Sequence, residues 1–446
     1  MPVCPLEFRY GRKEMKAIWS EEGKLQAMLD VEAALVLALA EVGRIPLRDA
    51  KMIASKANVK TVTVERVDAI EREISHDIMA VVRALSEQSG ASGGYVHLGA
   101  TSNDIIDTAT AVQLKRSIVL LLDDLQRLKK SLIALASKHK RTVMVGRTHG
   151  QFAVPVTFGL KMAVFAAETQ RHIHRLEEAR GRICVGKLSG AVGTGAALGK
   201  DALDVQEKVM ARLGISHELA ATQLVGRDRY AEFVLIMANI AASLERFATE
   251  VRNLQRSELG EVSEAFDAKK QVGSSTMPHK RNPIMAENVC GLARTLRGFA
   301  GPAMENVVLW HERDLTNSSA ERFILPHVCA LGDDIINKSA KVFETLGVNE
   351  GTMRKNLESA EGLIMAEAVM VALVAKGMGR QEAHELTRKC AMKAYDTGIG
   401  FRKALLGEPK VRKLMTQKEI EIALDPANYL GSAVKIVDEV IAKLKR

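Results

Sequence analysis

The stretch DRYAEFVLIMANIAASLERFATEVRNLQRS, residues 228–257, has the clearest hydrophobic periodicity in the chain. Its apolar side chains recur at alternating steps of four and three residues, at Phe233, Met237, Ile240, Leu244, Phe247, Val251 and Leu254. This heptad spacing predicts a helix that packs at a shallow angle in a bundle. The helix would be roughly 45 Å long, whereas an average helix has only about 11–12 residues. Helices of this length usually bury their apolar face against other helices, often across subunits.

The composition favours helices along the whole chain of 446 residues. Apolar residues make up 47% and aromatic residues only 4%, and there are 10 prolines. The abundance of Ala and Leu predicts an all-α fold rather than a sandwich or a barrel. Residues 95–100 are expected to be extended, and residues 146–151 to break the helical pattern. Further helices are expected at residues 24–42, 110–140, 158–180, 201–213, 284–299 and 326–346.

We expect three parts in this chain. An N-terminal helical domain spans residues 1–108, and a C-terminal helical domain spans residues 351–446. Between them, residues 109–350 form a central long-helix bundle domain that carries a polar loop at residues 273–283. Gly347 to Thr352 is the boundary expected before the last part.

Charge and cysteine content limit the possible partners and the compartment. The formal charge is +9, but acidic residues are interleaved with the basic ones, so the excess suits anionic small molecules as well as nucleic acid. No basic stripe with interleaved aromatics is present, which predicts no nucleic-acid partner. Five scattered cysteines without a C-x-x-C pair indicate reduced thiols in a cytoplasmic protein. No apolar run approaches the ~18 residues of a membrane span, so no membrane partner is expected.

The polar loop GSSTMPHKRNP, residues 273–283, interrupts the helical pattern. Its two prolines disfavour helix at and before their own positions. A loop of this length in a helical chain is more often functional than idle. The hydroxyls of Ser274 and Ser275, the backbone N–H groups and the charge of Lys280 are suited to holding a developing oxyanion. Considered alone, the same pattern also fits a capped loop between two helices.

The 273–283 loop resembles the signature G-S-S-x-M-P-x-K-x-N-P of the fumarase/aspartase superfamily. Thr101-Ser102 and Thr148-His149 resemble the other two conserved regions of that superfamily, in the usual order. Four further segments resemble the adenylosuccinate lyase family within that superfamily: Arg9-Tyr10, Ser75-His76-Asp77, Ser189 to Thr194, and Trp310 to Arg322. The resemblance runs from residue 9 to about residue 325. It implies a fumarase/aspartase-like all-α fold, a homotetramer with shared active sites and no cofactor.

The resemblance also implies a reaction. The family cleaves a C–N bond by β-elimination and releases fumarate in purine biosynthesis, which gives AMP from adenylosuccinate and AICAR from succinylaminoimidazole-carboxamide ribotide. Ser274 is implied as the base and His149 as the general acid, since imidazole titrates near neutrality. Lys280 and Asn282 would hold the carboxylate that gains charge. His76 would bind phosphate or support His149.

Substrate contacts are implied for further residues. Thr101 and Ser102 would hold the fumaryl carboxylates at a helix N-terminus, where anions are favoured. The nucleotide phosphate and sugar would be held by Arg9, Tyr10, Arg313, Ser318 and Arg322, because Arg suits phosphate. The other contacts expected from the resemblance are at Ser75, Asp77, Gln223, Ser275 and Asn288. Ser75 and Asn288 stand where some relatives carry Arg.

Parts of the sequence also fit other functions, within the superfamily and outside it. The sister activities are 3-carboxymuconate cycloisomerase and argininosuccinate lyase, and cycloisomerases share residues 277–283, so that string does not discriminate. His76-Asp77 and residues 313–322 favour the purine enzyme. The intact Ser274, His149 and Lys280 argue against a non-catalytic structural protein. An RNA-binding helical protein is the last alternative. No metal site is expected, because His172 and His174 lie on different helical faces and H-E-x-x-H is absent.

Overall fold

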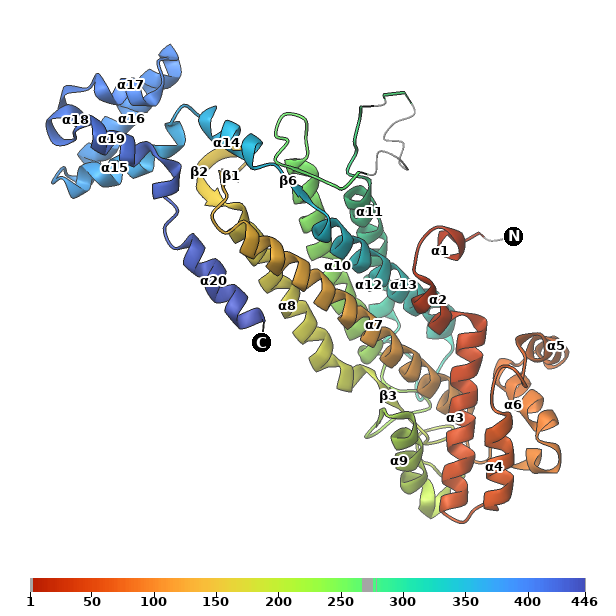
Figure 1. Ribbon diagram of the computed structural model, residues 1–446. Coiled ribbons are helices and arrows are strands. Elements are labelled where there is room, and N and C mark those ends of the chain that lie inside the picture. The colour runs from red at the N-terminus through yellow and green to blue at the C-terminus, as the bar shows by residue number, and fades with distance from the viewer. Residues whose placement is uncertain (1–2, 267–275, 278, 446) are drawn as a thin grey trace. The chain divides into compact units, whose positions relative to one another are not determined.

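The computed structural model describes residues 3–266, 276–277 and 279–445 of the chain (Figure 1). Over these residues helices make up nearly all of the regular structure, and the strands form three two-stranded sheets. The all-α prediction is therefore confirmed. None of the helices in these ranges has the length and apolar character that a bilayer crossing requires.

Contacts divide the chain into two compact units, and each gathers three separate stretches. Unit 1 consists of residues 1–125, 172–245 and 289–337, and unit 2 of residues 126–171, 246–288 and 338–446. The stretches interleave because the longest helices contribute residues to both units. The three-part division along the sequence, with boundaries after residues 108 and 350, stays a prediction.

Five long helices run side by side in the middle of the chain (Figure 1). They are α7 (Ser102–Lys138), α8 (Phe158–Ile183), α10 (Asp228–Leu254), α11 (Ile284–Gly298) and α13 (Thr316–Glu344). Helix α10 begins at the predicted residue and ends three residues earlier than predicted, and all seven residues of its heptad seam are buried. The periodicity of one apolar stripe was thus sufficient to predict this helix.

An aromatic cluster packs three of these helices together within unit 2. Phe165 of α8 stacks on Phe247 of α10, with ring centroids 4.1 Å apart. Phe343 of α13 meets both rings edge to face, at 6.2 and 6.4 Å. All three side chains are buried, and the Arg246 guanidinium lies 4.9 and 5.1 Å from the centroids of the two stacked rings. Such pairs add about 0.5–1.5 kcal/mol beyond the burial of their area.

Shorter helices build one apolar core in each unit. In unit 1 the core gathers α3 (Glu21–Glu41), α4 (Leu47–Lys56), α5 (Val64–Ile74), α6 (Asp77–Gln88) and α9 (Ala202–Leu213). In unit 2 it gathers α15 (Ala366–Ala375), α16 (Arg380–Thr397), α17 (Phe401–Leu406), α18 (Pro409–Leu414) and α19 (Gln417–Leu424). The remaining helices are α1 (Pro5–Phe8), α2 (Lys13–Trp19), α12 (Ala300–Glu305), α14 (Glu350–Glu358) and α20 (Ala433–Leu444).

The strands are short. The longest pair is the antiparallel hairpin of β1 (Val143–Thr148) and β2 (Gln151–Thr157), where only a break in the helical pattern was expected. Its β-branched residues favour the extended backbone. The other pairs have two residues a strand: β3 (Val185–Gly186) with β4 (Ser216–His217), and β5 (Val262–Ser263) with β6 (Gly347–Val348).

Two local predictions were wrong. Residues 95–100 are not extended: the glycine-rich Gly90–Tyr95 forms a 3-10 helix, and His97 and Gly99 then adopt positive φ values that no strand tolerates. The helix expected from residue 326 begins at Thr316, so Pro326 lies inside α13. A proline removes one backbone donor, but the residues around it, such as Ile324 and Val328, are buried and keep the helix packed.

The aromatic cluster yields a stability prediction. Phe247→Ala removes the ring that both other rings contact, so we expect the free energy of unfolding to fall by about 3–5 kcal/mol. Urea denaturation at one fixed protein concentration measures this loss. Leu219→Ala is the control, because Leu219 is 92% exposed and its truncation should change stability by about 0.5 kcal/mol or less. Equal unfolding midpoints for the two variants would contradict the assignment of Phe247 to the core.

Candidate active site

His149 lies in the two-residue turn of the β1–β2 hairpin, within unit 2. Thr148 pairs with Gln151, which leaves only His149 and Gly150 to connect the strands. Both have positive φ, 54° and 74°, as a type I′ turn requires. A non-glycine residue in this region is uncommon and mildly strained, and such strain concentrates at functional positions. The predicted general acid is therefore presented, exposed, at the tip of a short hairpin.

A buried ion pair fastens this hairpin to the segment after α10. The Arg147 guanidinium donates two hydrogen bonds to the Glu261 carboxylate, at 2.9 and 2.7 Å, and Glu261 is fully buried. Asn356 of α14 donates a third, at 2.9 Å. Arg147 also lies over the Phe152 ring, 5.5 Å from its centroid. Because a bidentate pair fixes orientation as well as distance, Arg147 sets the direction of the strand that leads to His149.

The 273–283 loop is described only in part. Ser274 and Ser275, the predicted base and its neighbour, lie outside the described residues, as do Gly273 and Pro278. The backbone N–H of Lys280 donates to the Met277 carbonyl at 3.0 Å, and the Lys280 side chain is exposed.

Glu264 and Gln255 hold the chain on both sides of this loop. The Glu264 carboxylate accepts the backbone N–H groups of Met285 and Ala286 in the first turn of α11, at 3.1 and 2.6 Å. Burial raises the pKa of Glu264, although these two hydrogen bonds oppose the shift. Gln255 accepts from the Glu264 backbone at 2.8 Å and donates to the Arg281 carbonyl at 3.2 Å. The residues that follow the loop are thereby tied to those that precede it.

Two predicted contacts follow the loop. Asn282 precedes α11, and its carbonyl accepts from the Ile284 backbone at 2.9 Å. Asn288 lies on α11 and accepts a hydrogen bond from the Lys338 ammonium of α13 at 2.5 Å. A positive charge therefore lies beside position 288, although this chain has Asn there.

In unit 1, Thr101 and Ser102 begin helix α7. The Thr101 N–H donates to the Asp104 carboxylate at 2.9 Å, which caps the first turn. Asp104 forms an ion pair with Lys187, and neither side chain is exposed. It also accepts the backbone N–H groups of Ser189 and Gly190, at 3.0 and 3.1 Å. Asp104 thus joins the start of α7 to residues 187–190.

The loop before Thr101 is held by His97, which belongs to none of the motifs in the sequence. Its backbone N–H donates to Glu32 at 3.1 Å, and its Nδ1 lies 2.6 Å from the other oxygen of the same buried carboxylate. Burial alone lowers the pKa of His97, but the hydrogen bond and charge of Glu32, with the charge of Asp104, outweigh it and raise the pKa. The sequence marks His97 only by its position shortly before Thr101.

The other predicted contacts in unit 1 form two connected pairs. Arg313 donates to the Gln223 amide oxygen at 2.6 Å, and Gln223 donates to the Ala191 carbonyl at 2.9 Å. Arg322, in the early part of α13, donates to the Asp77 carboxylate at 3.0 Å. The structure therefore brings Gln223 to Arg313 and Asp77 to Arg322, although these partners are far apart in the sequence.

The rest of the predicted set occupies helix ends. His76 caps α6, where its Nδ1 accepts the Met79 N–H at 3.4 Å. Ser75 ends α5 in a left-handed conformation, with φ at 53°. Ser318 lies in the first turn of α13, and Arg9 is exposed directly after α1 with Tyr10 half-buried beside it.

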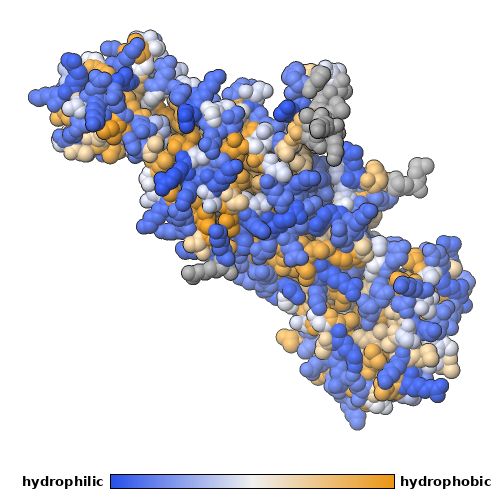
Figure 2. All heavy atoms as spheres, viewed as in Figure 1, coloured by the Kyte–Doolittle hydropathy of each residue, from blue (hydrophilic) through white to orange (hydrophobic). Residues whose placement is uncertain are grey.

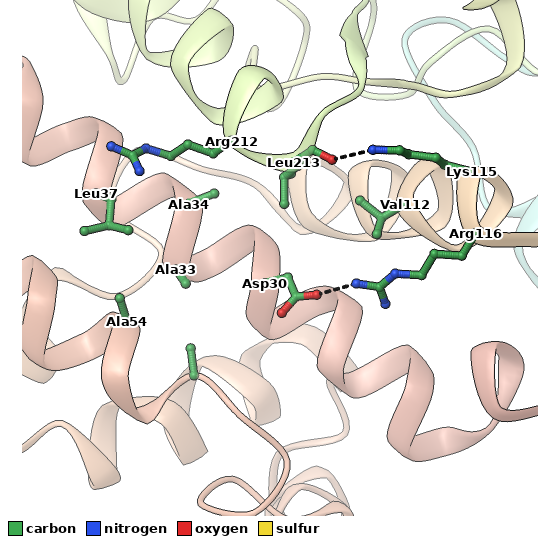
Figure 3. A pocket seen from close by; sticks show the side chains of 11 residues that line it. Asp30, Ala33, Ala34, Leu37, Ala54, Val112, Lys115, Arg116, Arg212 and Leu213 are labelled. Carbon is green, nitrogen blue, oxygen red and sulfur yellow. Dashed lines mark hydrogen bonds and ion pairs between the residues drawn. The ribbon is translucent and has the colours of Figure 1, made fainter. Parts of the chain in front are cut away.

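A pocket of about 450 Å³ in unit 1 contains none of the predicted residues. It lies among α3, α4, α7 and α9 (Figure 3). Its basic side chains are already engaged: Arg116 pairs with Asp30 at 3.0 Å, and Lys115 donates to the Gly214 carbonyl at 2.8 Å. Over the described parts of the chain, no three His, Cys, Asp or Glu side chains gather as a metal site.

The His97–Glu32 pair predicts a pH-dependent stability. Because the folded pKa of His97 is raised above its ordinary value of about 6.5, the pair stabilises fully below that value. Its contribution is lost as the pH rises through the folded pKa. We therefore expect His97→Gln to be less stable than the wild type at about pH 5.5, with the difference shrinking toward pH 9. Urea unfolding across this range measures it, with exposed His217→Gln as the control, and a difference that grows with pH would refute the pairing.

The chain is similar to known lyases. A family model described as "Lyase" matches residues 7–298, and one described as "Adenylosuccinate lyase C-terminus" matches residues 362–440. The chain is 49% identical to adenylosuccinate lyase from Methanocaldococcus jannaschii, over 100% of this chain and 96% of that protein.

Two solved structures extend the comparison. Fumarate lyase from Mesorhizobium sp. BNC1 is 33% identical with a TM-score of 0.91, over 99% of this chain and 100% of that one. The 3-carboxy-cis,cis-muconate lactonizing enzyme from Pseudomonas putida is 34% identical with a TM-score of 0.90, over 98% of both chains. The 273–283 loop, the full-length identity and the C-terminal match agree, and the chain belongs to the adenylosuccinate lyase family of the fumarase/aspartase superfamily.

Proposed function

We propose that this chain catalyses β-elimination of fumarate from adenylosuccinate, giving AMP, and from succinylaminoimidazole-carboxamide ribotide, giving AICAR. The observation that carries the proposal is 49% identity to an adenylosuccinate lyase over the whole chain. The C-terminal match at residues 362–440 supports it independently of the 273–283 loop. The reaction belongs to purine biosynthesis and requires acid–base chemistry and charge stabilisation from side chains.

The chemical roles follow from what the elimination needs. A base removes a proton from the carbon next to a carboxylate, and Ser274 is our assignment for it. Negative charge then builds up on that carboxylate, where Lys280 and Asn282 supply a cation and an amide, and such preorganised groups are often the largest catalytic contribution. His149 protonates the leaving nitrogen, and its place at a hairpin tip supports this role because the imidazole is accessible there.

Most of the binding roles are assigned to the polar segments of unit 1. Thr101 precedes and Ser102 begins a 37-residue helix whose N-terminus favours the fumaryl carboxylates. Arg322 would bind phosphate, and its exposed ion pair with Asp77 is the kind worth only about 0–1 kcal/mol, so a phosphate can replace it. Further substrate contacts are proposed at Arg9, Tyr10, Ser75, His76, Gln223, Ser275, Asn288, Arg313 and Ser318.

The sister activities have weaker support. The lactonizing enzyme has nearly the same fold but only 34% identity, against 49% for adenylosuccinate lyase. The family model that matches the C-terminal part is that of adenylosuccinate lyase. The activities of 3-carboxymuconate cycloisomerase and argininosuccinate lyase are therefore the alternative outcomes of the test.

We also propose a cytoplasmic homotetramer with active sites shared between subunits. After Thr101 the chain runs along α7 for 37 residues, roughly 55 Å, before it reaches the hairpin of His149. Long helices also leave large apolar side chains exposed, such as Val119, Val164 and Leu235, and apolar areas interrupt the polar surface in Figure 2. Exposed apolar patches mark interfaces, and symmetric assembly would cover them. The five free cysteines support a reducing compartment.

Apolar residues are also exposed beside the proposed phosphate-binding segment. Trp310, Leu315 and Phe323 are 75%, 65% and 64% exposed, and they flank Arg313 and Arg322 in the sequence. A second subunit that covers them would lie next to these two cations. This supports a binding site that needs more than one copy of the chain.

A fumarate-release assay tests the proposed activity. Purified protein should release fumarate from adenylosuccinate and not from argininosuccinate, because the C-terminal match and the full-length identity favour the purine substrate. Fumarate is followed by its ultraviolet absorbance, with carboxymuconate offered in parallel. Release from argininosuccinate alone, or lactone formation alone, would replace the proposed activity with the corresponding sister reaction.

Mixing two inactive variants tests the shared site. His149→Ala and Ser274→Ala homotetramers should each be inactive, because each lacks one of the two proton-transfer groups. If the acid and the base of one site come from different chains, unfolding, mixing equal amounts and refolding should restore about one site in four. The activity of wild-type enzyme that is unfolded and refolded in the same way defines full activity. Zero activity from properly assembled mixed tetramers would refute the shared site.

A further inference from the structure

Arg227 is the centre of a buried polar network in unit 1. It donates at 2.7 and 2.9 Å to the two oxygens of Asp107, and at 2.9 and 3.2 Å to the two oxygens of Glu321. A fifth hydrogen bond, of 2.9 Å, reaches the Val225 carbonyl. A guanidinium carries five N–H donors, so every one is used, and the group is only 5% exposed. Lysine, with three donors, has no equivalent of this arrangement.

The two acidic partners are as tightly constrained as Arg227. Asp107 also accepts the Val225 N–H at 2.9 Å, and it is 1% exposed. Burial raises the pKa of Glu321, while the charge of Arg227 and a hydrogen bond from Asn317 partly offset the shift. The Tyr230 ring covers the guanidinium, 5.0 Å from its centroid. Both carboxylates are therefore held by the same guanidinium.

The network joins three segments to which the proposed function gives substrate contacts. Asp107 lies on α7, six residues after Thr101. Arg227 and Val225 follow Gln223 in the segment before α10. Glu321 lies on α13 beside Arg322, the proposed phosphate ligand. Each acid therefore belongs to a different binding segment, and Arg227 connects the two.

Stability alone is a poor explanation for this network. Taking three charged groups out of water is costly for each ion, and well-packed apolar residues of similar volume are often as stabilising. What the ionic network adds is a fixed geometry, because five directional hydrogen bonds define the positions of both carboxylates. A fixed geometry matters most where two ends of one ligand must be held at a set spacing.

We propose that Arg227 is a positioning residue that sets the spacing between the carboxylate-binding start of α7 and the phosphate-binding start of α13. This inference rests on the proposed function, since it takes the substrate to carry carboxylates at one end and phosphate at the other. Binding energy from the remote phosphate speeds the reaction only if the reacting end is correctly placed at the same time. Arg227 should thus determine how much the phosphate contributes to turnover.

The test compares a nucleotide substrate with the same molecule lacking its phosphate. We measure kcat/KM for adenylosuccinate and for succinyladenosine, and take their ratio as the contribution of the phosphate. In Arg227→Lys the ratio should fall about 10-fold or more, because a misplacement of about 1 Å can cost as much as about 100-fold in rate. A purely structural defect reduces the amount of active enzyme, which lowers both values equally and leaves the ratio unchanged.

Two further variants make the result decisive. Arg66→Lys is the matched control, because Arg66 makes a bidentate pair with Glu87, at 2.9 and 2.8 Å, on the exposed side of α5. Its ratio should equal that of the wild type. Glu321→Gln keeps the size of the side chain and removes one charge, so it should lower the ratio by less than Arg227→Lys does. If Arg227→Lys does not fold, Glu321→Gln takes its place in the test.

The outcomes separate the inference from the function on which it rests. An active wild type whose ratio is unchanged in Arg227→Lys, or in Glu321→Gln if only that variant folds, overturns the positioning role and leaves the proposed function intact. A wild type that releases no fumarate from either compound overturns the proposed function itself. A lower ratio in both variants, with Arg66→Lys unchanged, establishes Arg227 as the residue that couples the two ends of the substrate.

Discussion

Burial of the apolar seam of α10 is the constraint on which the rest of the structure depends. Its seven seam residues are all buried, and an exposed seam would cost about 25 cal/mol for each Å² of apolar surface. The helices around α10 must therefore be long as well, and they carry the functional segments at their ends. Thr101 precedes α7, the hairpin of His149 follows it, and the 273–283 loop leads into α11. Polar loops at helix ends are the natural place for chemistry in such a fold, because the helices themselves are committed to packing.

Buried charged groups fix these loops where apolar packing ends. Asp104 with Lys187 holds the start of α7, Arg147 with Glu261 holds the hairpin, and Arg227 holds α7 and α13 through two acids. Apolar contacts are non-directional, whereas bidentate ion pairs define angles and distances. The chain thus uses hydrophobic burial for the bundle and ionic networks for the segments to which we assign substrate contacts.

The family assignment and the structure inform different parts of the function. Identity over the whole chain identifies an adenylosuccinate lyase family member, and the likeness to a lactonizing enzyme shows that this fold serves more than one reaction. The geometry shows which of the proposed binding residues contact one another. Arg313 contacts Gln223 and Arg322 contacts Asp77, so two of the proposed phosphate- and sugar-binding residues are each in contact with another proposed substrate contact within unit 1.

The sequence by itself determined the helical class, the long helices and the candidate residues. Heptad spacing predicted α10 to within three residues of its end, because a 3.6-residue period is a local property of the chain. The candidate site residues came from motifs, and their roles stay proposals. Local patterns failed where a long-range contact decides the conformation. His97, within residues 95–100, is hydrogen-bonded to the Glu32 carboxylate, and residues 143–157 form a hairpin that is held by Glu261. Pro326 lies inside a packed helix.

Only the tertiary structure decided which charged residues act together. Asp107, Arg227 and Glu321 are separated by about a hundred residues at each step, and nothing in their local sequence marks them as partners. The same holds for Arg147 with Glu261 and for His97 with Glu32. Periodicity reports which face of a helix is buried, but the partner of a buried charge depends on which distant segment lies against that face. That choice is made by the packing of the whole unit, and it is what places the candidate residues in space.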